Sequence, residues 1–200
     1  MKKGCLVLLG IALVIGFIVV LVGIGSYNKM VDKEEGVKEK WSQVENVYQR
    51  RLDLIPNLVA TVKGYAAHEK ETFQAVTEAR SQAKGSINVS PEMLNDPAMF
   101  AKFQQAQNTL SGALSRLMVV VERYPDLKAN QNFLDLQSQL EGTENRIAVE
   151  RKRFNEVARD FNTYIRKFPR NILANIFGFK QKAYFQAQEG ANIAPKVNFD

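Results

Sequence analysis

The sequence is poor in cysteine and histidine, two residues that often carry catalysis or bind metals. It has one cysteine, Cys5, and one histidine, His68, in 200 residues. A single cysteine cannot form an intrachain disulfide, and a single histidine cannot supply the paired Glu-x-x-His ligands of a di-iron helical bundle. A catalytic triad would have to use His68, yet no glycine-flanked serine or other nucleophile signature is present. We therefore predict no catalytic residue, no cofactor and no metal ligand, and we interpret His68 as a surface or packing residue.

Phosphate-binding glycine loops and strand patterns are also missing. The glycines are not spaced as in a loop that binds a phosphate group. No alternating apolar pattern, which would indicate a strand leading into such a loop, is present. Carboxylate pairs such as Glu69 and Glu71 occur as they do on any charged helix, so they support no acid–base mechanism. These absences favour an all-α, non-enzymatic structural or interaction protein. Two alternatives stay open: a hydrolytic or metal-dependent enzyme, and a self-assembling membrane scaffold in which apolar seams pair between chains.

Charge is absent from residues 5–25, which form an uninterrupted apolar run. All 21 acidic residues, and all basic residues except Lys2 and Lys3, lie after it. A helix of about 20 apolar residues crosses the roughly 30 Å hydrocarbon core of a bilayer. We therefore predict one transmembrane helix here, with the lipid bilayer as a partner. A cleaved signal peptide is the alternative, because Gly23 and Gly25 are small residues at a spacing that signal peptidase tolerates.

The lysines on the two sides of this run favour opposite topologies. Lys2 and Lys3 favour a cytoplasmic N-terminus, whereas the lysines that follow the run favour the reverse. The latter are Lys29, Lys33, Lys38 and Lys40. A short lysine-led tail ahead of an apolar segment is typical of a signal anchor. We therefore expect the rest of the chain on the extracytoplasmic side of a cell membrane.

The net charge of +6 and the isoelectric point near 9.4 invite a nucleic-acid interpretation. The basic residues of the segment 146–159 are interleaved with acidic ones, so no continuous phosphate-tracking patch forms and we predict no nucleic-acid partner. Anionic lipid head groups suit the basic residues near the C-terminal end better. That cluster comprises Arg166, Lys167, Arg170, Lys180 and Lys182.

The segment Trp41–Ala83 carries an apolar seam with a spacing of three and four residues. Such a seam predicts one helix of about 60 Å at 1.5 Å per residue, which needs helical partners of similar length. Pro56 interrupts it, because proline lacks the backbone N–H and clashes with the carbonyl group four residues earlier. We therefore expect a kink or a break at Ile55–Pro56. We also expect the polar stretch Ser26–Lys40 to carry the helix out of the bilayer into this seam.

Two further long helices complete the predicted bundle. The first covers residues 97 to about 123 and begins behind a helix-capping residue, Asp96. The second covers about 130–168 and ends at Pro169. A short helix at 172–177 follows, for which packing on the bundle, docking on the membrane surface and a flexible partner-binding tail all stay open.

These elements divide the chain into three parts. Residues 1–25 form a short tail and the transmembrane helix. Residues 26–190 form an elongated antiparallel bundle of three long helices plus the short C-terminal helix. Residues 191–200 form a flexible tail. We expect the irregular connection at 84–100 to pack on the bundle, with a partner-binding tip as the alternative.

Polar side chains gather beside the seams near the middle of the predicted bundle. Opposite charges on the 41–83 helix and the 130–168 helix predict a buried or half-buried ionic network, which would set the register of the helices more than add stability. Its predicted members are Arg51, Asp53, Asn57, Glu69, Arg80, Glu144, Arg151 and Asn155, with Pro56 as the helix kink.

Three long strings carry a resemblance to a known family. They are RRLDLIPNLVATVKGYAAHE at residues 50–69, ERYPDLKAN at 122–130 and GTENRIAVERKRFN at 142–155. In this order they resemble the bacterial LemA family, and the likeness covers almost the whole chain after the first helix. The resemblance implies a bacterial helical bundle with a membrane anchor, often found with membrane-linked proteases or TPM-domain proteins. It implies no reaction.

We therefore expect a single-pass protein of the bacterial cytoplasmic (inner) membrane that acts as a structural or interaction module of the envelope. Its partners would be other membrane or envelope proteins, whose identity the sequence does not give. Association with a second copy of the chain stays open.

Overall fold

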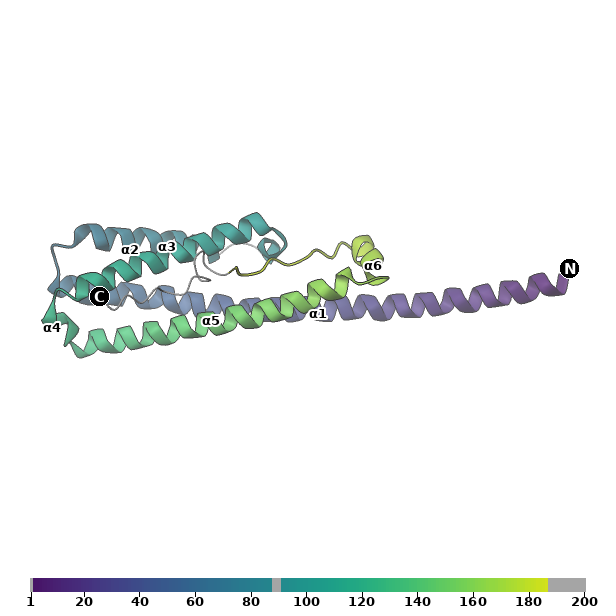
Figure 1. The fold of residues 1–200 in the computed structure, drawn as a ribbon, viewed down its shortest axis with the longest axis horizontal. Helices are drawn as coiled ribbons and strands as arrows, with labels where there is room; N and C mark the ends of the chain where they lie inside the picture. The colour runs from purple at the N-terminus through teal and green to yellow at the C-terminus, as the bar shows by residue number, and fades with distance from the viewer. Residues whose placement is uncertain (1, 88–90, 187–200) are drawn as a thin grey trace, which may run out of the picture.

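The computed structural model describes residues 2–87 and 91–186. Within these residues all regular elements are helices, which confirms the predicted all-α fold. The long helices form an elongated antiparallel bundle (Figure 1). In chain order the elements are α1 (Lys2–Tyr65), α2 (Lys70–Ile87), the 3₁₀ helix η1 (Pro91–Asn95), α3 (Pro97–Val121), α4 (Pro125–Lys128), α5 (Gln131–Arg166) and α6 (Arg170–Phe177).

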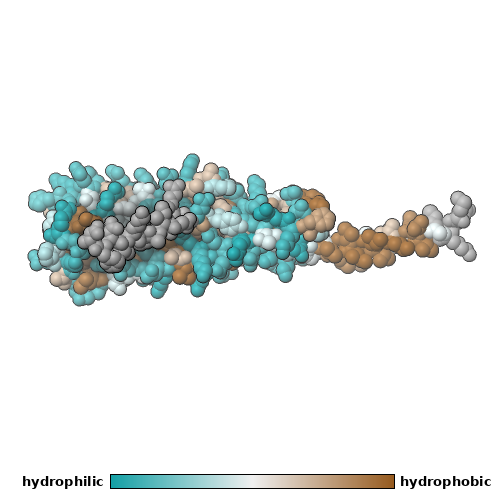
Figure 2. Space-filling model, viewed as in Figure 1, coloured by the Kyte–Doolittle hydropathy of each residue, from teal (hydrophilic) through white to brown (hydrophobic). Residues whose placement is uncertain are grey.

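Helix α1 continues without interruption from the apolar run into the bundle. Its 64 residues correspond to about 95 Å of helix. The polar stretch after the run is helical, as predicted, and an ion pair of 2.6 Å between Lys38 Nζ and Glu35 Oε1 supports it. From Met30 onward one face of α1 is buried, whereas the large apolar side chains described before Met30 are exposed (Figure 2). The predicted boundary at residue 25 therefore falls inside one helix.

We predicted a kink or a break at Ile55–Pro56, and a break is not present. The chain remains helical at Pro56, α1 ends at Tyr65, and residues 66–69 form a turn after which α2 runs back along α1. The Glu69 N–H closes this turn by donating to the Ala66 carbonyl at 3.1 Å. The single helix predicted over 41–83 is therefore two helices, and the bundle has four long helices, α1, α2, α3 and α5, where three were expected.

The turn was missed because it keeps the phase of the apolar seam. Val62 before the turn, Ala66 at its first position, and Phe73 and Val76 after it are all buried in the same core. Since both helices bury a stripe of the same spacing, the periodic pattern continues across the turn. The turn residues 66–69 also include neither glycine nor proline, the usual signals of a break.

Both predicted helices after residue 96 are confirmed, and each begins behind a side-chain cap. Asp96 Oδ1 accepts hydrogen bonds from the backbone N–H groups of Ala98 and Met99 at the start of α3. Asn130 Oδ1 accepts one from Phe133 at 3.1 Å at the start of α5. These caps satisfy N–H groups that have no partner within the helix, and so fix where each helix starts.

The described part of the connection between α2 and α3 packs on the bundle, as expected. Ile87, Met93 and Leu94 are buried. The Leu94 carbonyl also accepts a hydrogen bond of 2.8 Å from the N–H of Ala183, near the end of the described chain. The connection therefore helps to hold the C-terminal segment.

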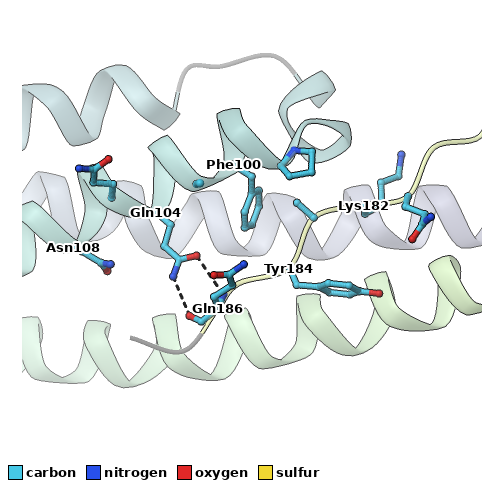
Figure 3. A pocket seen from close by; sticks show the side chains of 11 residues that line it. Phe100, Gln104, Asn108, Lys182, Tyr184 and Gln186 are labelled. Atoms are coloured by element: carbon cyan, nitrogen blue, oxygen red, sulfur yellow. Dashed lines mark hydrogen bonds between the residues drawn. The ribbon is translucent and has the colours of Figure 1, made fainter. Parts of the chain in front are cut away.

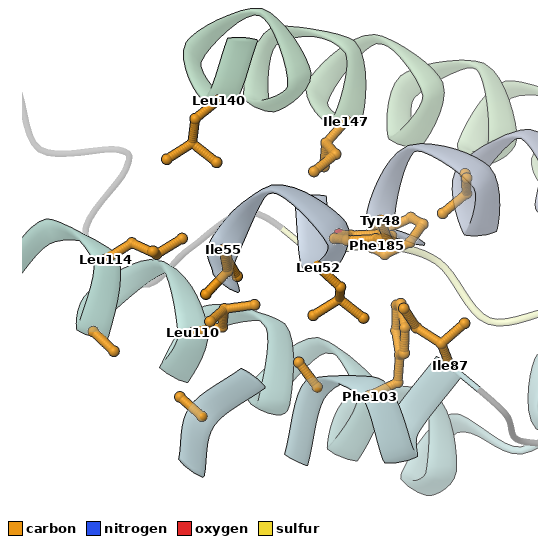
Figure 4. Close-up of a cluster of buried hydrophobic side chains, with 14 of the residues drawn as sticks. Tyr48, Leu52, Ile55, Ile87, Phe103, Leu110, Leu114, Leu140, Ile147 and Phe185 are labelled. Carbon is orange, nitrogen blue, oxygen red and sulfur yellow. The ribbon is translucent and has the colours of Figure 1, made fainter. Parts of the chain in front are cut away.

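One apolar core runs inside the four long helices (Figure 4). Burying a side chain of leucine or phenylalanine size stabilises a fold by about 1.5–3 kcal/mol, so this core is the main source of stability. Its middle includes Tyr48, Leu52 and Ile55 from α1, Ile87 from α2, Phe103, Leu110 and Leu114 from α3, Leu140 and Ile147 from α5, and Phe185.

The chain after α5 closes against the bundle. Helix α6 packs through Ala174 and Leu173. It ends at Gly178, whose φ of 76° is a left-handed conformation that glycine adopts without strain. Residues 179–186, called the strap below, then run between α3 and α5 without helical structure. The tail predicted at 191–200 lies outside the described residues.

Candidate functional site

Among the described residues, the most deeply buried charged side chain is that of Arg51. It leaves α1 toward α3 and α5 and is 1% exposed. Nη1 donates to Ser111 Oγ at 3.0 Å and to Glu144 Oε1 at 2.9 Å, and Nη2 donates to Gln107 Oε1 at 2.5 Å. The planar guanidinium group suits several acceptors at once, which lysine could not match.

Gln107 extends these contacts to the fourth long helix. Its Nε2 donates to the Ala83 carbonyl at 3.2 Å and to Ser86 Oγ at 3.3 Å on α2. One polar chain therefore connects all four long helices. We call it the Arg51 network: Arg51, Ser86, Gln107, Ser111 and Glu144. Gln107 was not a predicted member, although a glutamine in the apolar line of α3, between Phe103 and Leu110, was the signal that could have identified it.

We expect the Arg51 network to fix the register of the helices more than to add stability. Removing a charge from water costs several kcal/mol, which well-placed hydrogen bonds largely offset. A shift of α3 or α5 by one turn would leave the buried guanidinium group without acceptors, and that cost opposes sliding. The Tyr48 ring lies 5.0 Å from Arg51 Cζ. Burial raises the pKa of the Tyr48 hydroxyl.

Pro56 leaves one carbonyl group of α1 without its helical donor, and Arg80 replaces that donor. In a regular helix the N–H of residue 56 would donate to the Leu52 carbonyl, but proline has none. Arg80 Nε on α2 donates to this carbonyl at 2.8 Å. The bond satisfies the freed acceptor, so α1 can continue past Pro56, and it ties α2 to α1 at that point.

Other predicted network members lie elsewhere and do not extend the Arg51 network. Glu69 pairs with Arg123 at 3.2 Å at the end of the bundle where α1 turns into α2. Asp53 accepts a hydrogen bond of 2.7 Å from Gln49 on an exposed face of α1, and Asn57 is exposed. The two remaining predicted members, Arg151 and Asn155 on α5, bind the strap.

Three side-chain amides hold the strap by its backbone. Asn162 accepts a hydrogen bond from the Lys182 N–H at 2.8 Å and donates to the Lys182 carbonyl at 2.9 Å. Asn155 likewise accepts a hydrogen bond from the Phe185 N–H and donates one to the Phe185 carbonyl. Gln104 from α3 makes the same pair of hydrogen bonds with the backbone of Gln186 (Figure 3). Because these bonds go to main-chain atoms, they satisfy the backbone of a segment that has no helix or sheet of its own.

Phe185 anchors the strap in an aromatic cluster. Its ring lies 4.9 Å from Phe100, 5.7 Å from Phe154 and 6.2 Å from Trp41, measured between ring centres. The guanidinium carbon of Arg151 lies 4.6 Å from the same ring. Aromatic pairs of this kind add about 0.5–1.5 kcal/mol beyond burial. The strap is therefore part of the core.

Lys182 was predicted to belong to a basic cluster that faces lipid, and for this residue the prediction is wrong. Its side chain is buried, and Nζ donates to Glu34 Oε1 at 2.5 Å and to Asn95 Oδ1 at 2.7 Å. Lys182 is thus paired inside the protein and does not face a head group. The sequence could not show this pairing, because only the fold brings Glu34 on α1 next to the strap.

The described residues show polar contacts that hold helices and strap in place. No set of three or more His, Cys, Asp or Glu side chains among them is placed to hold a metal ion. The hollow between the strap and α3 has Lys182 as its one charged lining residue, and the others are amide, aromatic or aliphatic (Figure 3). A second hollow, between the strap and α5, has charged lining residues of both signs: Arg151, Lys152, Glu156 and Arg159. His68 is exposed in the turn after α1.

The residues of the Arg51 network and of the strap lie within a match to a known family. The model of the LemA family matches residues 40–199, a range that includes the whole Arg51 network and the strap. The chain belongs to the LemA family. The resemblance carried by the three sequence strings is thereby confirmed.

Individual relatives share most of this LemA-family chain. Magnetosome protein MamQ 2 of Paramagnetospirillum magneticum is 32% identical over 210 residues, which cover 96% of this chain and 76% of that protein. Magnetosome protein MamQ of Magnetospirillum gryphiswaldense is 29% identical over 189 residues, covering 86% and 70%. Protein LemA of Metamycoplasma hominis is 26% identical over 166 residues, covering 83% and 71%. The coverage by MamQ 2 also takes in most of α1 before residue 40.

Removing Arg51 should destabilise the bundle more than removing Glu144. Arg51→Ala leaves Gln107 and Ser111 without their donor and opens a cavity, so we expect the free energy of unfolding to fall by about 3–5 kcal/mol. The Glu144 side chain is 41% exposed, so water can partly replace it, and Glu144→Ala should cost about 1–2 kcal/mol. Urea unfolding followed by Trp41 fluorescence measures both. An Arg51→Ala variant within about 0.5 kcal/mol of the parent would contradict this.

Arg80 should matter less once residue 56 can donate a hydrogen bond. We expect Arg80→Met to cost about 1–2 kcal/mol in the parent chain, because the Leu52 carbonyl loses its donor. In a Pro56→Ala background the new N–H satisfies that carbonyl, so the same substitution should cost about 1 kcal/mol less. Urea unfolding of the four variants gives this coupling, with the exposed Arg116→Met as a control in both backgrounds. If the stability effects of Arg80→Met and Pro56→Ala were strictly additive, Arg80 would not act through the Leu52 carbonyl.

Proposed function

We propose that this LemA-family chain is a single-pass membrane protein whose bundle acts as a non-enzymatic interaction module of the bacterial envelope. The observation that carries the proposal is the continuity of α1, which is one helix from Lys2 to Tyr65. Its N-terminal part is long and apolar enough to cross a membrane, and its C-terminal part belongs to the bundle core. The same helix therefore anchors the module and forms part of it.

The apolar part of α1 favours lipid as its surroundings. Its large side chains are exposed on all sides, from 51% for Ile11 to 69% for Leu8. Figure 2 shows an apolar rod that projects from a mostly hydrophilic bundle. A helix that is apolar all round suits hydrocarbon, where its backbone groups are already satisfied internally. In water the same surface would be a far larger apolar patch than soluble proteins carry.

The bundle extends away from the membrane along α1. From Tyr27 to Tyr65 this helix covers about 57 Å at 1.5 Å per residue. Helix α5 runs beside much of that length, while α2 and α3 cover the part farther from the N-terminus (Figure 1). The module thus presents long charged helix faces to its neighbours. We propose other membrane or envelope proteins as the partners of these faces.

Two further observations support the role and the side of the membrane. The MamQ relatives are named for the magnetosome and not for a reaction, which favours a structural role. Lys2 and Lys3 precede the apolar run, which is typical of a cytoplasmic N-terminus followed by an extracytoplasmic domain. The proposed location is therefore the cytoplasmic membrane, with the bundle outside the cytoplasm.

Cysteine labelling of the full chain in spheroplasts tests this topology. In a Cys5→Ser background, Ser138→Cys on the exposed surface of α5 should react with a membrane-impermeant maleimide before lysis. Lys3→Cys, ahead of the apolar run, should react only after lysis. Labelling of both after lysis serves as the control for reactivity. The reverse pattern would place the bundle in the cytoplasm and contradict the proposed location.

A further inference from the structure

We propose that α6 is a second membrane contact, which lies on the bilayer surface and binds anionic lipid head groups. The surface concerned is an apolar face on and just before α6, called the α6 face: Phe168, Ile172, Ile176 and Phe177. The proposal rests on α1 spanning the bilayer, as proposed above. It adds a place where the bundle itself touches the membrane.

The α6 face is exposed although its side chains are large and apolar. The exposed fractions are 81% for Phe168, 51% for Ile172, 68% for Ile176 and 54% for Phe177. The other side of α6 is already in use, because Ala174 is buried and Leu173 packs on the core. Four large apolar side chains within ten residues form a patch of the kind that marks an interaction surface.

The position of α6 identifies lipid as the occupant of this face. The ring of Phe177 lies 4.8 Å from that of Tyr27, and the ring of Phe179 lies 5.8 Å from it. Tyr27 follows the apolar run directly, where aromatic side chains mark the membrane–water interface. Figure 1 shows α6 at the end of the bundle from which the N-terminal part of α1 projects, and Figure 2 shows apolar surface at that end. A bilayer around residues 5–25 would therefore meet α6.

The charges beside the α6 face favour an anionic surface. The sequence has no acidic residue between Asp160 and Glu189. Arg166, Lys167 and Arg170 lie just before or at the start of α6, and Lys180 lies after it; the buried Lys182 takes no part. Basic residues next to an apolar face are typical of helices that lie in the interface of anionic membranes. A purely apolar protein partner would gain nothing from this charge.

A contact at α6 restricts the orientation of the bundle. One spanning helix alone leaves the bundle free to tilt and to rotate about α1. A second contact on one side of α1 removes that rotation. The same helix faces then point along the membrane at all times, which is what an interaction module with fixed neighbours requires.

Site-specific fluorescence in vesicles tests the proposal on the full chain. In a Cys5→Ser background, an environment-sensitive fluorophore is attached to Ile176→Cys on the α6 face. Matched variants carry it at Ile15→Cys in the apolar run, or at Ser138→Cys on the exposed surface of α5. The vesicles contain a phosphatidylcholine–phosphatidylglycerol mixture with a nitroxide-labelled lipid as quencher. We expect quenching at positions 15 and 176 to be at least about twofold stronger than at 138.

The three positions separate failure of this inference from failure of the proposed function. Weak quenching at position 15 would show that α1 does not span the bilayer. Strong quenching at 15 with only background quenching at 176 would overturn the α6 contact and leave the membrane anchor intact.

The lipid composition tests the role of charge. Quenching at position 176 should fall in vesicles of phosphatidylcholine alone, and a Lys167→Gln, Lys180→Gln variant should show a similar fall in the anionic mixture. Equal quenching in both lipids would overturn binding to anionic head groups. An added Ile172→Asp substitution should reduce quenching at 176 in the anionic mixture, and no reduction would overturn the use of the apolar face.

Discussion

In the proposed membrane-spanning arrangement, helix α1 has to remain continuous while its surroundings change from hydrocarbon to water. In the hydrocarbon, every backbone polar group must be bonded within the helix and every side is apolar. In the bundle, one face is buried and the others meet solvent. Pro56 is the one residue of α1 that removes an internal hydrogen bond, and Arg80 from α2 supplies the missing donor. The position of the bundle relative to the membrane depends on this continuity.

Polar groups inside the bundle specify its arrangement, while apolar burial supplies most of its stability. Apolar seams of the same spacing can slide past each other by one turn at modest cost, but a buried guanidinium group cannot leave its acceptors. Arg51 connects α1 to α3 and α5, and Gln107 adds α2. Polar side chains position the strap in the same way, because Asn155 and Asn162 bind one stretch of its backbone in one register. The interaction module proposed above would need such a fixed register to present its long faces to partners.

Elements with local signals could be predicted, and elements that depend on distant contacts could not. Helices α3 and α5 were predicted because Asp96 and a seam after Asn130 mark them in the sequence itself. The turn after Tyr65 keeps the seam in phase and therefore leaves no periodic signal. The strap has no period of its own, since side chains of other helices satisfy its backbone. Lys182 looked like a surface cation, because Glu34 comes near it only in the folded chain.

The most direct test of a continuous α1 is the distance across the boundary between membrane and bundle. Nitroxide labels at Val19→Cys and Ser42→Cys, both exposed positions, can be placed in a Cys5→Ser background in lipid nanodiscs. Double electron–electron resonance should then give one narrow distribution centred near 35 Å, as a helical rise of 1.5 Å per residue requires. A broad distribution, or a clearly shorter mean, would reveal a hinge between the span and the bundle and would contradict the continuity of α1.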